Sequence, residues 1–558
     1  MDRRALSRHE IAVHGDLMAL SLVAALAFPA PVRSQSIEEI GLNIIDLEPI
    51  PQATVTAVGA GVRWVRIVVY WRGIELSQGV YDFSFLDTHV DAATGSGLNV
   101  LLDFATIPGW ANGADPDCDW LIGECTIPPA SPTYFGSFVT AVVDRYKDRV
   151  SHWEIWNEPE YVAFWNGTTS EFMNLIATPG IASIRSADPL AVVMGPSTFS
   201  GLADFQEFTV QMCSLIDKLS IHFYEGGSAA AFAQLDGQFL PWITTNCNKG
   251  VWITEMGVDS ALAGEIFQAA DYVATYAGSV SRTKVEKTYI FHWADGGGYG
   301  LVESSLTNFR PKRSYFEVQD YTNSLLGVPN YLVIRDTLAS NTTNRSVGSP
   351  LNGTTSEVGG KTWSTNTTLV FGANEITTST GGDTAHVGGV SFNPPLDPAK
   401  PVNLVEADFI VNGTVWSAVG FSQSATGGYW GHGQAWVHIG PSGDYAVYAD
   451  GLTHLLRVGD VPNFSPNGLN RVRVHHNRTE NKLSVVINSQ LVLVPYDLDA
   501  LSYTPGLSHA GVHVQTASGT GGGLASFDNF RVFSMPEYII FADDFEVGTT
   551  ANWSSTVP

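Results

Sequence analysis

Basic residues are scarce in this 558-residue chain. It holds 29 Lys and Arg against 55 Asp and Glu, for a formal net charge of −26 at pH 7. A field of that sign repels phosphate backbones, so nucleic acid is not an expected partner, and a polyanionic substrate is weakly disfavoured. Charged residues make up only 15% of the chain and hydrophobic residues 44%. This composition indicates a packed globular protein rather than a disordered one.

The chain also lacks an apolar run long enough to cross a membrane. The N-terminal run Leu17–Phe28 is much shorter than the ~20 residues that a spanning helix needs. Three arginines precede this run, and small residues follow it, spaced for cleavage after Ser34. We therefore expect residues 1–34 to be a cleaved signal peptide, with a membrane anchor as the alternative. The mature protein would be secreted (extracellular or periplasmic), without stable membrane insertion.

Cysteine is rare, and its positions exclude a familiar metal site. Cys118, Cys125, Cys213 and Cys247 do not have zinc-ligand spacing, and no histidine cluster accompanies them. We expect no metal and no cofactor. An even number of cysteines in an exported chain permits two disulfides.

A Gly-rich phosphate loop is missing too, which argues against a doubly wound dinucleotide-binding sheet. Between residues 40 and 325 strand-like runs instead alternate with helix-like stretches such as 134–147, 171–186 and 261–279. The runs are nearly continuous in apolar character, as in strands buried on both faces. They are Gly41–Leu47, Val62–Trp71, Asn99–Phe104, His152–Trp156, Ala191–Gly195, Leu219–Tyr224, Val251–Thr254 and Thr288–Trp293. Eight such units predict an α/β fold, a (β/α)8 TIM barrel over residues 35–328.

The composition and the pattern of apolar residues change after about residue 330. Residues 337–385 are rich in Thr, Ser, Asn and Gly, which predicts loops or a loosely structured entry into a new domain. Residues 402–533 then hold short strands separated by turns, the pattern of an all-β jelly-roll sandwich. We assign residues 329–536 to a linker and this sandwich, and residues 537–558 to a C-terminal tail.

The barrel assignment predicts how the cysteines pair. Cys213 and Cys247 each lie a few residues before a predicted strand, so both belong at the bottom rim of the barrel. Cys118 and Cys125 lie in the loop after the third strand, on the opposite face. A bridge between the two sets would have to pass through the barrel, which disulfide geometry forbids. We therefore predict Cys118–Cys125 and Cys213–Cys247.

Two carboxylates stand where barrel catalysts are found, at the C-terminal ends of strands. Glu158 lies in Trp-Asn-Glu-Pro after the fourth strand, and Glu255 ends the seventh strand in Ile-Thr-Glu-Met-Gly. Those strands face each other across the barrel mouth, so the two side chains can flank one bond. Such a pair suits glycosidic cleavage, with retention of configuration at ~5 Å separation and inversion at ~6.5–9.5 Å.

These motifs resemble the clan A glycoside hydrolases. The segment GVRWVRIVVYWRGIELSQGVYDFSFLD is similar to families 39, 42 and 5, and WEIWNEPEYVAFW is most like family 39. The resemblance covers roughly residues 40–325 and implies retention. It also implies that Glu158 is the acid/base and Glu255 the nucleophile of a glycosidase acting on a carbohydrate, most simply a β-linked oligo- or polysaccharide.

The same resemblance implies substrate-binding roles for other residues. Asn157 would contact the sugar 2-hydroxyl, Arg66 would lie under the nucleophile, and Trp293 would form a sugar platform. His222 and Tyr224 would be partners from strand six. Trp71, Trp110, Tyr161 and Trp165 are further subsite candidates, whereas we expect Glu75, Glu154 and Glu160 to be structural or peripheral.

The second domain resembles the concanavalin A-like, laminin G-like jelly rolls. The similarity rests on NRVRVHHNRTENKLSVVINSQLV and FDNFRV. Such domains often bind glycans, and Trp416, Trp430 and Trp436 could form a stacking platform, with a core or spacer role as the alternative. For the whole chain, the alternatives to hydrolysis are transglycosylation with the same pair and carbohydrate binding by an inactive barrel.

Overall fold

The computed structural model describes residues 36–535 except for several segments. These are residues 46–50, 116, 120, 200, 225, 296–297, 306–307, 327–331, 337–344, 367–368, 373–375, 379–383, 394, 412–415, 466–469, 489 and 517–525. The predicted signal segment, residues 1–34, and the predicted tail, residues 537–558, lie outside the described residues.

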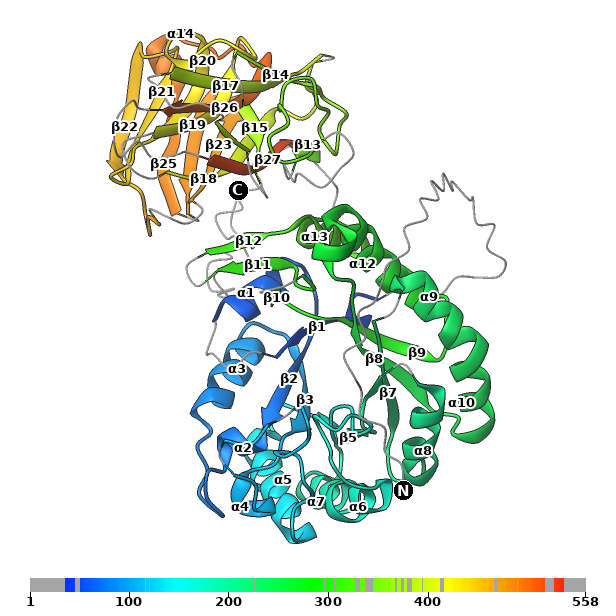
Figure 1. Ribbon diagram of the computed structural model, residues 1–558. Coiled ribbons are helices and arrows are strands. Elements are labelled where there is room, and N and C mark those ends of the chain that lie inside the picture. The colour runs from blue at the N-terminus through cyan, green and yellow to red at the C-terminus, as the bar shows by residue number, and fades with distance from the viewer. Residues whose placement is uncertain are drawn as a thin grey trace.

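The first domain is the predicted parallel barrel (Figure 1). Within the described residues its sheet runs in the order β5-β4-β3-β2-β1-β9-β8-β7-β6, and a pairing of β5 with β7 closes it. The strands are β1 (Ile40–Ile44), β2 (Trp64–Tyr70), β3 (Asn99–Ala105), β4 (His152–Glu154), β5 (Val192–Met194), β6 (Thr198–Phe199), β7 (Lys218–Phe223), β8 (Gly250–Met256) and β9 (Val285–Ile290). The short β6 continues β5 along β7, so the two together form the fifth barrel strand.

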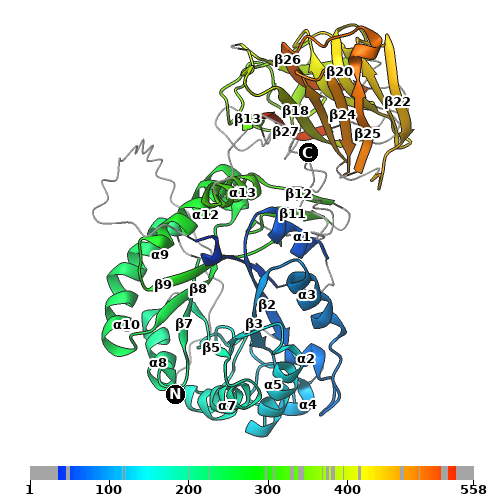
Figure 2. The ribbon, with the colours of Figure 1, turned by 180° about the vertical axis from the view of Figure 1, so that it is seen from behind.

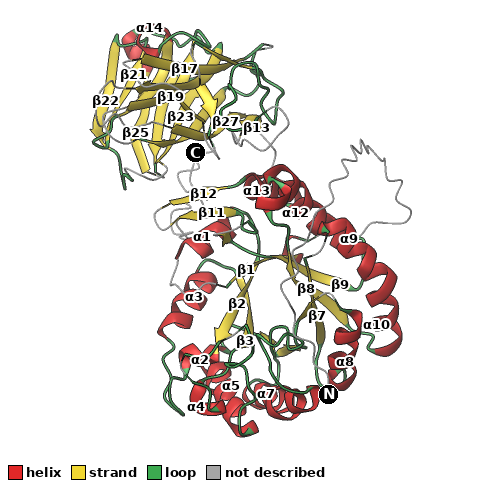
Figure 3. Cartoon of the chain, in the orientation of Figure 1, coloured by secondary structure: helices red, strands yellow, loops and turns green. Residues whose placement is uncertain are grey.

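Helices surround the barrel (Figure 3). A π-helical turn at Met173–Ala177 joins α6 to α7, and a second at Leu235–Phe239 joins α9 to α10. A small sheet of β10 (Ala294–Asp295), β11 (Val302–Ser305) and β12 (Asn308–Pro311) follows β9. The helices are α1 (Pro51–Gly59), α2 (Trp71–Ile74), α3 (Ser84–Gly95), α4 (Gly109–Asn112), α5 (Pro132–Tyr146), α6 (Thr169–Phe172), α7 (Thr178–Ala187), α8 (Leu202–Met212), α9 (Gly227–Gln234), α10 (Leu240–Asn246), α11 (Ser260–Ala263), α12 (Glu265–Val280) and α13 (Arg313–Leu325).

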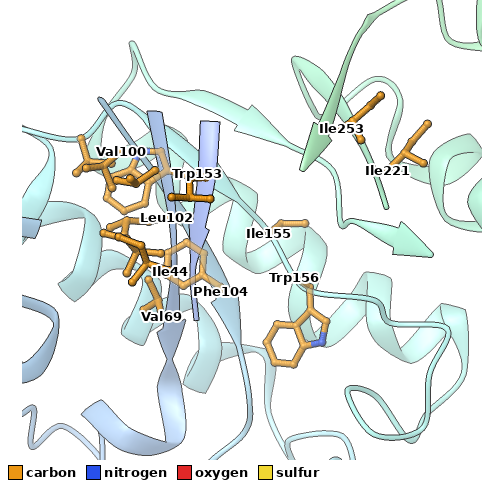
Figure 4. Close-up of a cluster of buried hydrophobic side chains, with 14 of the residues drawn as sticks. Ile44, Val69, Val100, Leu102, Phe104, Trp153, Ile155, Trp156, Ile221 and Ile253 are labelled. Carbon is orange, nitrogen blue, oxygen red and sulfur yellow. The ribbon is translucent and has the colours of Figure 1, made fainter. Parts of the chain in front are cut away.

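Side chains alternate along each barrel strand, as the strand period of two requires. One set packs outward against the helices, and Figure 4 shows part of this core, including Ile44, Val69, Val100, Leu102 and Phe104. The other set points into the barrel. Its apolar members form a separate buried cluster: Trp64, Leu101, Met194, Trp252 and Tyr289.

A β-bulge interrupts this alternation on β8. Along the pairing of β7 with β8, Ile221 lies opposite Ile253, but the next residue, His222, lies opposite Glu255. One extra residue is therefore inserted at Thr254. As a result, Thr254 and Glu255 both direct their side chains toward the barrel interior, although they are neighbours in sequence.

The second domain is an antiparallel sandwich that begins earlier than predicted. One sheet pairs β13 (Leu332–Asp336) with β27 and runs β15-β16-β27-β18-β23-β24-β25, and the other runs β14-β17-β26-β19-β20-β21-β22. Its strands are β14 (Trp363–Thr365), β15 (Leu369–Phe371), β16 (Ile376–Thr378), β17 (Thr384–Ser391), β18 (Val402–Ile410), β19 (Trp416–Ser422), β20 (Gly433–Ile439), β21 (Asp444–Ala449), β22 (His454–Asp460), β23 (Asn470–Asn477), β24 (Lys482–Ile487), β25 (Gln490–Asp497), β26 (His509–Thr516) and β27 (Ser526–Met535), with α14 (Tyr429–His432).

The loose entry predicted for residues 337–385 is thus wrong in part. Strands β14, β15 and β16 lie inside it, and the side chains of Leu351, Trp363 and Leu369 are fully buried in the sandwich core. Short strands with single apolar anchors among many polar residues do not produce a strand pattern that can be recognised in the sequence.

The last barrel helix faces the sandwich (Figure 2). Arg335 on β13 donates hydrogen bonds to Glu317 and Asp320 of α13, at 2.5 and 2.7 Å. The guanidinium of Arg531 on β27 lies over the ring of Phe316, 4.2 Å from its centroid. These contacts lie beside α13, on the outside of the barrel.

Both disulfides have the predicted partners. Cys118 joins Cys125 and Cys213 joins Cys247, with Cα–Cα distances of 5.3 and 5.7 Å. Across the described part of the chain, the structure holds no helix with the length and apolar character needed to cross a membrane.

Candidate active site

A buried arginine organises the floor of the barrel mouth. Arg66 on β2 uses its whole guanidinium, which carries five N–H bonds. It donates to Glu154 at 2.5 Å, Glu255 at 2.6 Å, Asp103 at 2.8 Å, Asn157 at 2.9 Å and Asn43 at 3.1 Å. The prediction that Arg66 lies under Glu255 agrees with this geometry.

The partners of Arg66 come from neighbouring strands. Asn43 on β1 lies directly opposite Arg66, and Asp103 on β3 lies opposite Glu154 on β4. Sequence reasoning did not single out Asn43 or Asp103, and it took Glu154 to be structural or peripheral. A signal was present, because a polar residue inside a buried apolar strand needs a partner within the fold.

The charges at this floor do not cancel one to one. Arg66 contacts the three carboxyl groups of Asp103, Glu154 and Glu255. Burial raises the pKa of Asp103 well above its usual value, more than the attraction of Arg66 lowers it. Burial therefore favours the protonated form of Asp103, which lessens the negative charge that faces Arg66.

Glu255 is held at both oxygens. Its Oε1 accepts from Arg66, and its Oε2 accepts from the hydroxyl of Tyr224, whose pKa burial raises well above its usual value. A cation thus holds one carboxylate oxygen and a hydroxyl donor holds the other. Glu255 can therefore act as a nucleophile whose two oxygens are fixed in position.

Glu158 sits on a strained turn after β4. Its φ of 41° lies in the left-handed region, which non-glycine residues rarely adopt, and its N–H donates to the carbonyl of Ser197 at 2.9 Å. The turn places the carboxyl group in the barrel mouth. There burial raises the pKa of Glu158 to about 7, although the charge of Arg66 opposes the shift. A carboxyl group with that pKa can donate a proton near neutral pH.

His222 connects Glu158 to the floor. Its Nδ1 lies 2.6 Å from Glu158 Oε1 and its Nε2 lies 3.1 Å from the hydroxyl of Thr254, which in turn contacts Glu154. Burial lowers the pKa of His222 to about 4, so the ring is neutral at pH 7. A neutral imidazole has one N–H and one acceptor nitrogen. It can therefore accept from protonated Glu158 or donate to ionised Glu158.

The two glutamates lie close together. One oxygen of Glu158, one ring nitrogen of His222 and one oxygen of Glu255 are all within 4.8 Å of one another. These atoms could also surround a metal ion, but a cation there would face the guanidinium of Arg66, 2.6 Å from Glu255 Oε1. This close approach fits the ~5 Å separation of retaining enzymes better than the ~6.5–9.5 Å of inverting enzymes.

The glutamates open into a cavity of about 590 Å³. That volume lies within the usual range for small-ligand sites. Asn157 lines it and turns its Oδ1 toward Arg66, so its NH₂ group is left to donate into the cavity. The described lining residues are Ile45, Val68, Tyr70, Ala105, Thr106, Asn157, Glu158, Tyr161, Ala163, Phe164, Phe199, Tyr224, Glu255, Phe291 and Tyr299.

The tryptophans predicted for subsites lie elsewhere. Trp293 is 1% exposed and belongs to the core, because β9 ends at Ile290 and the chain has already turned. Trp71 and Trp165 are buried as well, and the indole of half-buried Trp110 donates to the carbonyl of Glu75. None of these four is among the described lining residues.

Of the remaining candidates, Tyr161 does line the cavity. Glu75 is structural, as expected: its carboxylate accepts from the indole of Trp71 and from the N–H of Gly79, both at 2.7 Å. Glu160 accepts from the N–H of Phe199, a cavity residue that the sequence did not suggest.

Comparison with known proteins agrees with this geometry. Residues 39–294 match the family described as Cellulase (glycosyl hydrolase family 5). Together with the barrel and its facing glutamates, the match makes this region a glycoside hydrolase domain. It is a domain of clan A, as the sequence motifs suggested.

Individual relatives are distant. A beta-xylosidase of Geobacillus stearothermophilus is 28% identical over 156 residues, 26% of this chain and 31% of that protein. A probable glucan 1,3-beta-glucosidase of Arthroderma benhamiae is 29% identical over 181 residues, 30% of this chain and 40% of that protein. The chain thus spans well under half the length of these curated relatives. Among solved structures, a GH39 beta-xylosidase from Caulobacter crescentus has a TM-score of 0.44 at 17% identity, covering 68% of this chain and 83% of that one.

Proposed function

We propose that the protein is a secreted retaining glycoside hydrolase that cleaves β-linked glycosides, with Glu255 as nucleophile and Glu158 as acid/base. One observation carries this proposal: the two carboxyl groups come within 4.8 Å of each other, and Arg66 binds one while burial raises the pKa of the other to about 7. Facing carboxyl groups with different environments divide the acid and nucleophile roles.

In the first step a carboxylate oxygen of Glu255 attacks the anomeric carbon. The bond from that carbon to the glycosidic oxygen breaks, and the proton of Glu158 moves to the departing oxygen, so the aglycone leaves as an alcohol. The products are a glycosyl ester on Glu255 and ionised Glu158. When the single proton of neutral His222 is on Nδ1, the ring donates to Oε1 of the new carboxylate at 2.6 Å, and its Nε2 accepts from the hydroxyl of Thr254.

In the second step water replaces the aglycone. Ionised Glu158 takes one proton from the water as its oxygen attacks the anomeric carbon, and the bond to Glu255 breaks. The sugar leaves with its original anomeric configuration. Glu158 is again protonated and Glu255 again ionised. The short gap between the carboxyl groups supports retention, because inverting enzymes hold theirs ~6.5–9.5 Å apart to admit water.

Azide separates the two roles in one experiment. With an activated aryl glycoside, Glu158→Ala forms the glycosyl-enzyme but lacks the base for hydrolysis, so added azide restores turnover and yields a glycosyl azide of retained configuration. Glu255→Ala with azide yields the inverted azide, because azide then occupies the nucleophile's face. Near-normal turnover by either variant without azide, or an inverted first product from the unmodified enzyme, contradicts the assignment.

The same assays test the alternatives. A transglycosidase forms the same intermediate but passes the sugar to an added acceptor sugar faster than to water. A binding protein retains glycans and releases no reducing sugar. Hydrolysis as the main reaction supports the proposal over both.

Secretion is the second part of the proposal. The N-terminal sequence pattern and the two disulfides support it, since disulfides persist in oxidising compartments. N-terminal sequencing of protein recovered from the medium or periplasm is expected to start at Gln35. Recovery of uncleaved protein in the membrane fraction contradicts a cleaved signal.

We also propose that the sandwich contacts glycan through Trp430. This indole is 45% exposed and packs edge-on against Trp416 at 5.1 Å, whereas Trp436 is fully buried beneath it. An exposed ring on an aromatic base can stack on a sugar face. Retention of the full chain on insoluble β-glucan or xylan is expected to fall with Trp430→Ala and to persist with Leu455→Ala, a 55% exposed control on the neighbouring β22. Equal retention of both variants contradicts the site.

A further inference from the structure

The cavity wall beyond the catalytic groups is apolar. Apart from Asn157, Glu158 and Glu255, the described lining residues carry no charged group, amide or imidazole. Aliphatic side chains and aromatic rings make up most of the wall: Ile45, Val68, Ala105, Ala163, Phe164, Phe199 and Phe291, together with the rings of four tyrosines.

Three of the five hydroxyl groups in this wall are already engaged. The hydroxyl of Tyr70 donates to the carbonyl of Ile45 at 2.7 Å, and the hydroxyl of Thr106 accepts from the N–H of Arg72 at 3.2 Å. The hydroxyl of Tyr224 is bound to Glu255. A second sugar ring in this wall would lose water from several hydroxyls and gain few hydrogen bonds, which costs binding energy for each unpaired group.

Apolar surface continues at the rim. The disulfide-closed loop presents Leu121 and Ile122, which are 80% and 61% exposed. The loop is fastened to the turn that lines the cavity, because the hydroxyl of Thr126 donates to the carbonyl of Val162 at 2.5 Å. Val162 and its neighbour Tyr161 are each 41% exposed.

We infer that the leaving group of the substrate is apolar: the enzyme acts on β-glycosides of alkyl, aryl or lipid alcohols rather than on chains of sugars. This inference rests on the proposed function, since it assigns the wall to the aglycone that Glu158 protonates. The sugar itself would occupy the floor near Asn157 and Glu255, where the polar groups are.

A series of alkyl glycosides tests directly whether the cavity wall binds an apolar leaving group. A panel of 4-nitrophenyl β-glycosides first identifies the sugar that the enzyme accepts. Methyl, butyl and octyl glycosides of that sugar then have leaving groups of similar acidity but different apolar area. We expect kcat/KM to rise about two- to fourfold for each early methylene, on the order of 100-fold from methyl to octyl. The disaccharide of the same sugar should fall roughly tenfold or more below the octyl glycoside.

Variants of the wall provide the control. Phe164 and Phe199 are partly exposed in the cavity, so serine at either position should leave the fold intact. We expect Phe164→Ser or Phe199→Ser to lower the octyl-to-methyl ratio of kcat/KM about five- to tenfold. Leu190→Ser, at an 89% exposed position before β5 and thus on the opposite face of the barrel, should leave the ratio unchanged.

A separate assay distinguishes a membrane lipid from a soluble glycoside as the source of the apolar group. A dodecyl glycoside is offered free, below micelle formation, and in phosphatidylcholine vesicles. Faster turnover in vesicles that falls with the double variant Leu121→Ser, Ile122→Ser, but not with Leu190→Ser, identifies a membrane lipid. Faster turnover of the free form identifies a soluble apolar glycoside.

Two results overturn the inference. One is a flat alkyl series in an enzyme that cleaves the aryl panel, and the other is a preference for the disaccharide. If no panel member is cleaved, the proposed function fails instead. Calorimetric binding of octyl against methyl β-glucoside and β-xyloside then still decides about the cavity, and equal affinities would reject it.

Discussion

Nδ1 of His222 lies 2.6 Å from Oε1 of Glu158, and the ring that makes this contact is neutral. The pair therefore stays hydrogen-bonded whether Glu158 holds its proton or has given it away. The other ring nitrogen contacts Thr254, whose hydroxyl can rotate to donate or accept. Through Glu154 and Arg66 this chain reaches Glu255, so the two glutamates belong to one buried network.

The pKa of Glu158 predicts the pH profile. Because the acid must be protonated, kcat/KM for an alkyl glycoside should fall tenfold per pH unit above about pH 7. An activated aryl glycoside should lack that limb, since its leaving group needs no proton. In His222→Leu the limb should move to higher pH, because ionised Glu158 loses a charge-assisted donor. An unmoved limb would separate His222 from the acid.

Tyr224→Phe tests the second contact of Glu255. Removing the hydroxyl leaves Glu255 Oε2 without its donor. A hydrogen bond to a charged group contributes about 1.5–3 kcal/mol, so kcat/KM should fall by roughly ten- to a hundredfold. The thermal unfolding midpoint should change little, since the ring remains. A decrease below about twofold would show that the hydroxyl has no part in positioning Glu255.

Arg66 is expected to hold the barrel together as well as the site. Arg66→Met removes the only cation that the structure shows in contact with Asp103, Glu154 and Glu255 and leaves these carboxyl groups buried. Breaking a buried ion pair costs about 3–5 kcal/mol in free energy of unfolding. Lys147→Ala removes an ion pair with Asp144 in which the two side chains are 37% and 54% exposed, and it should cost far less stability. Urea unfolding measures both, and similar losses would contradict the structural role.

Glu160 predicts a pH dependence of stability. Its Oε2 is buried without a hydrogen-bond partner, and burial raises its pKa to about 8. The unfolded chain releases this proton near pH 4.5 while the folded protein keeps it, so the contribution of Glu160 to stability declines from about pH 4.5 to pH 8. Glu160→Gln should therefore become more stable relative to the unmodified protein as pH rises from 5 to 8. A difference independent of pH would exclude this.

Removal of each disulfide should affect stability and activity to different degrees. Cys213–Cys247 spans 34 residues, so replacing both by serine should cost ~3–4 kcal/mol of unfolding free energy on the chain-entropy argument. Cys118–Cys125 spans 7 residues and should cost ~2 kcal/mol. Loss of Cys118–Cys125 should lower kcat/KM more than loss of Cys213–Cys247, because the loop next to Cys125 is hydrogen-bonded to the carbonyl of Val162 in the turn that lines the cavity. The opposite ranking would contradict this division.

Much of the fold could be predicted because a continuous apolar run in the sequence indicates a strand that is buried on both faces. The eight predicted strands all occur, and the cysteine pairs follow from their order. The prediction was less accurate for short strands that hold a single buried apolar residue, such as Trp363 in β14. The predicted positions of tryptophan side chains were also less accurate. The sequence near a strand end does not show whether a tryptophan faces the cavity or, like Trp293, the core.

The sequence by itself determined the class of protein, since Glu158 and Glu255 are local motifs at strand ends that need only the barrel to bring them together. Only the tertiary structure decided how they are held. The bulge at Thr254 turns Glu255 inward, and the left-handed turn directs Glu158 into the mouth. The apolar cavity wall combines residues from segments far apart in sequence, such as Ile45, Phe199 and Phe291. Strand periodicity encodes burial but not which loop side chains converge, and this depends on backbone irregularities that no residue pattern specifies.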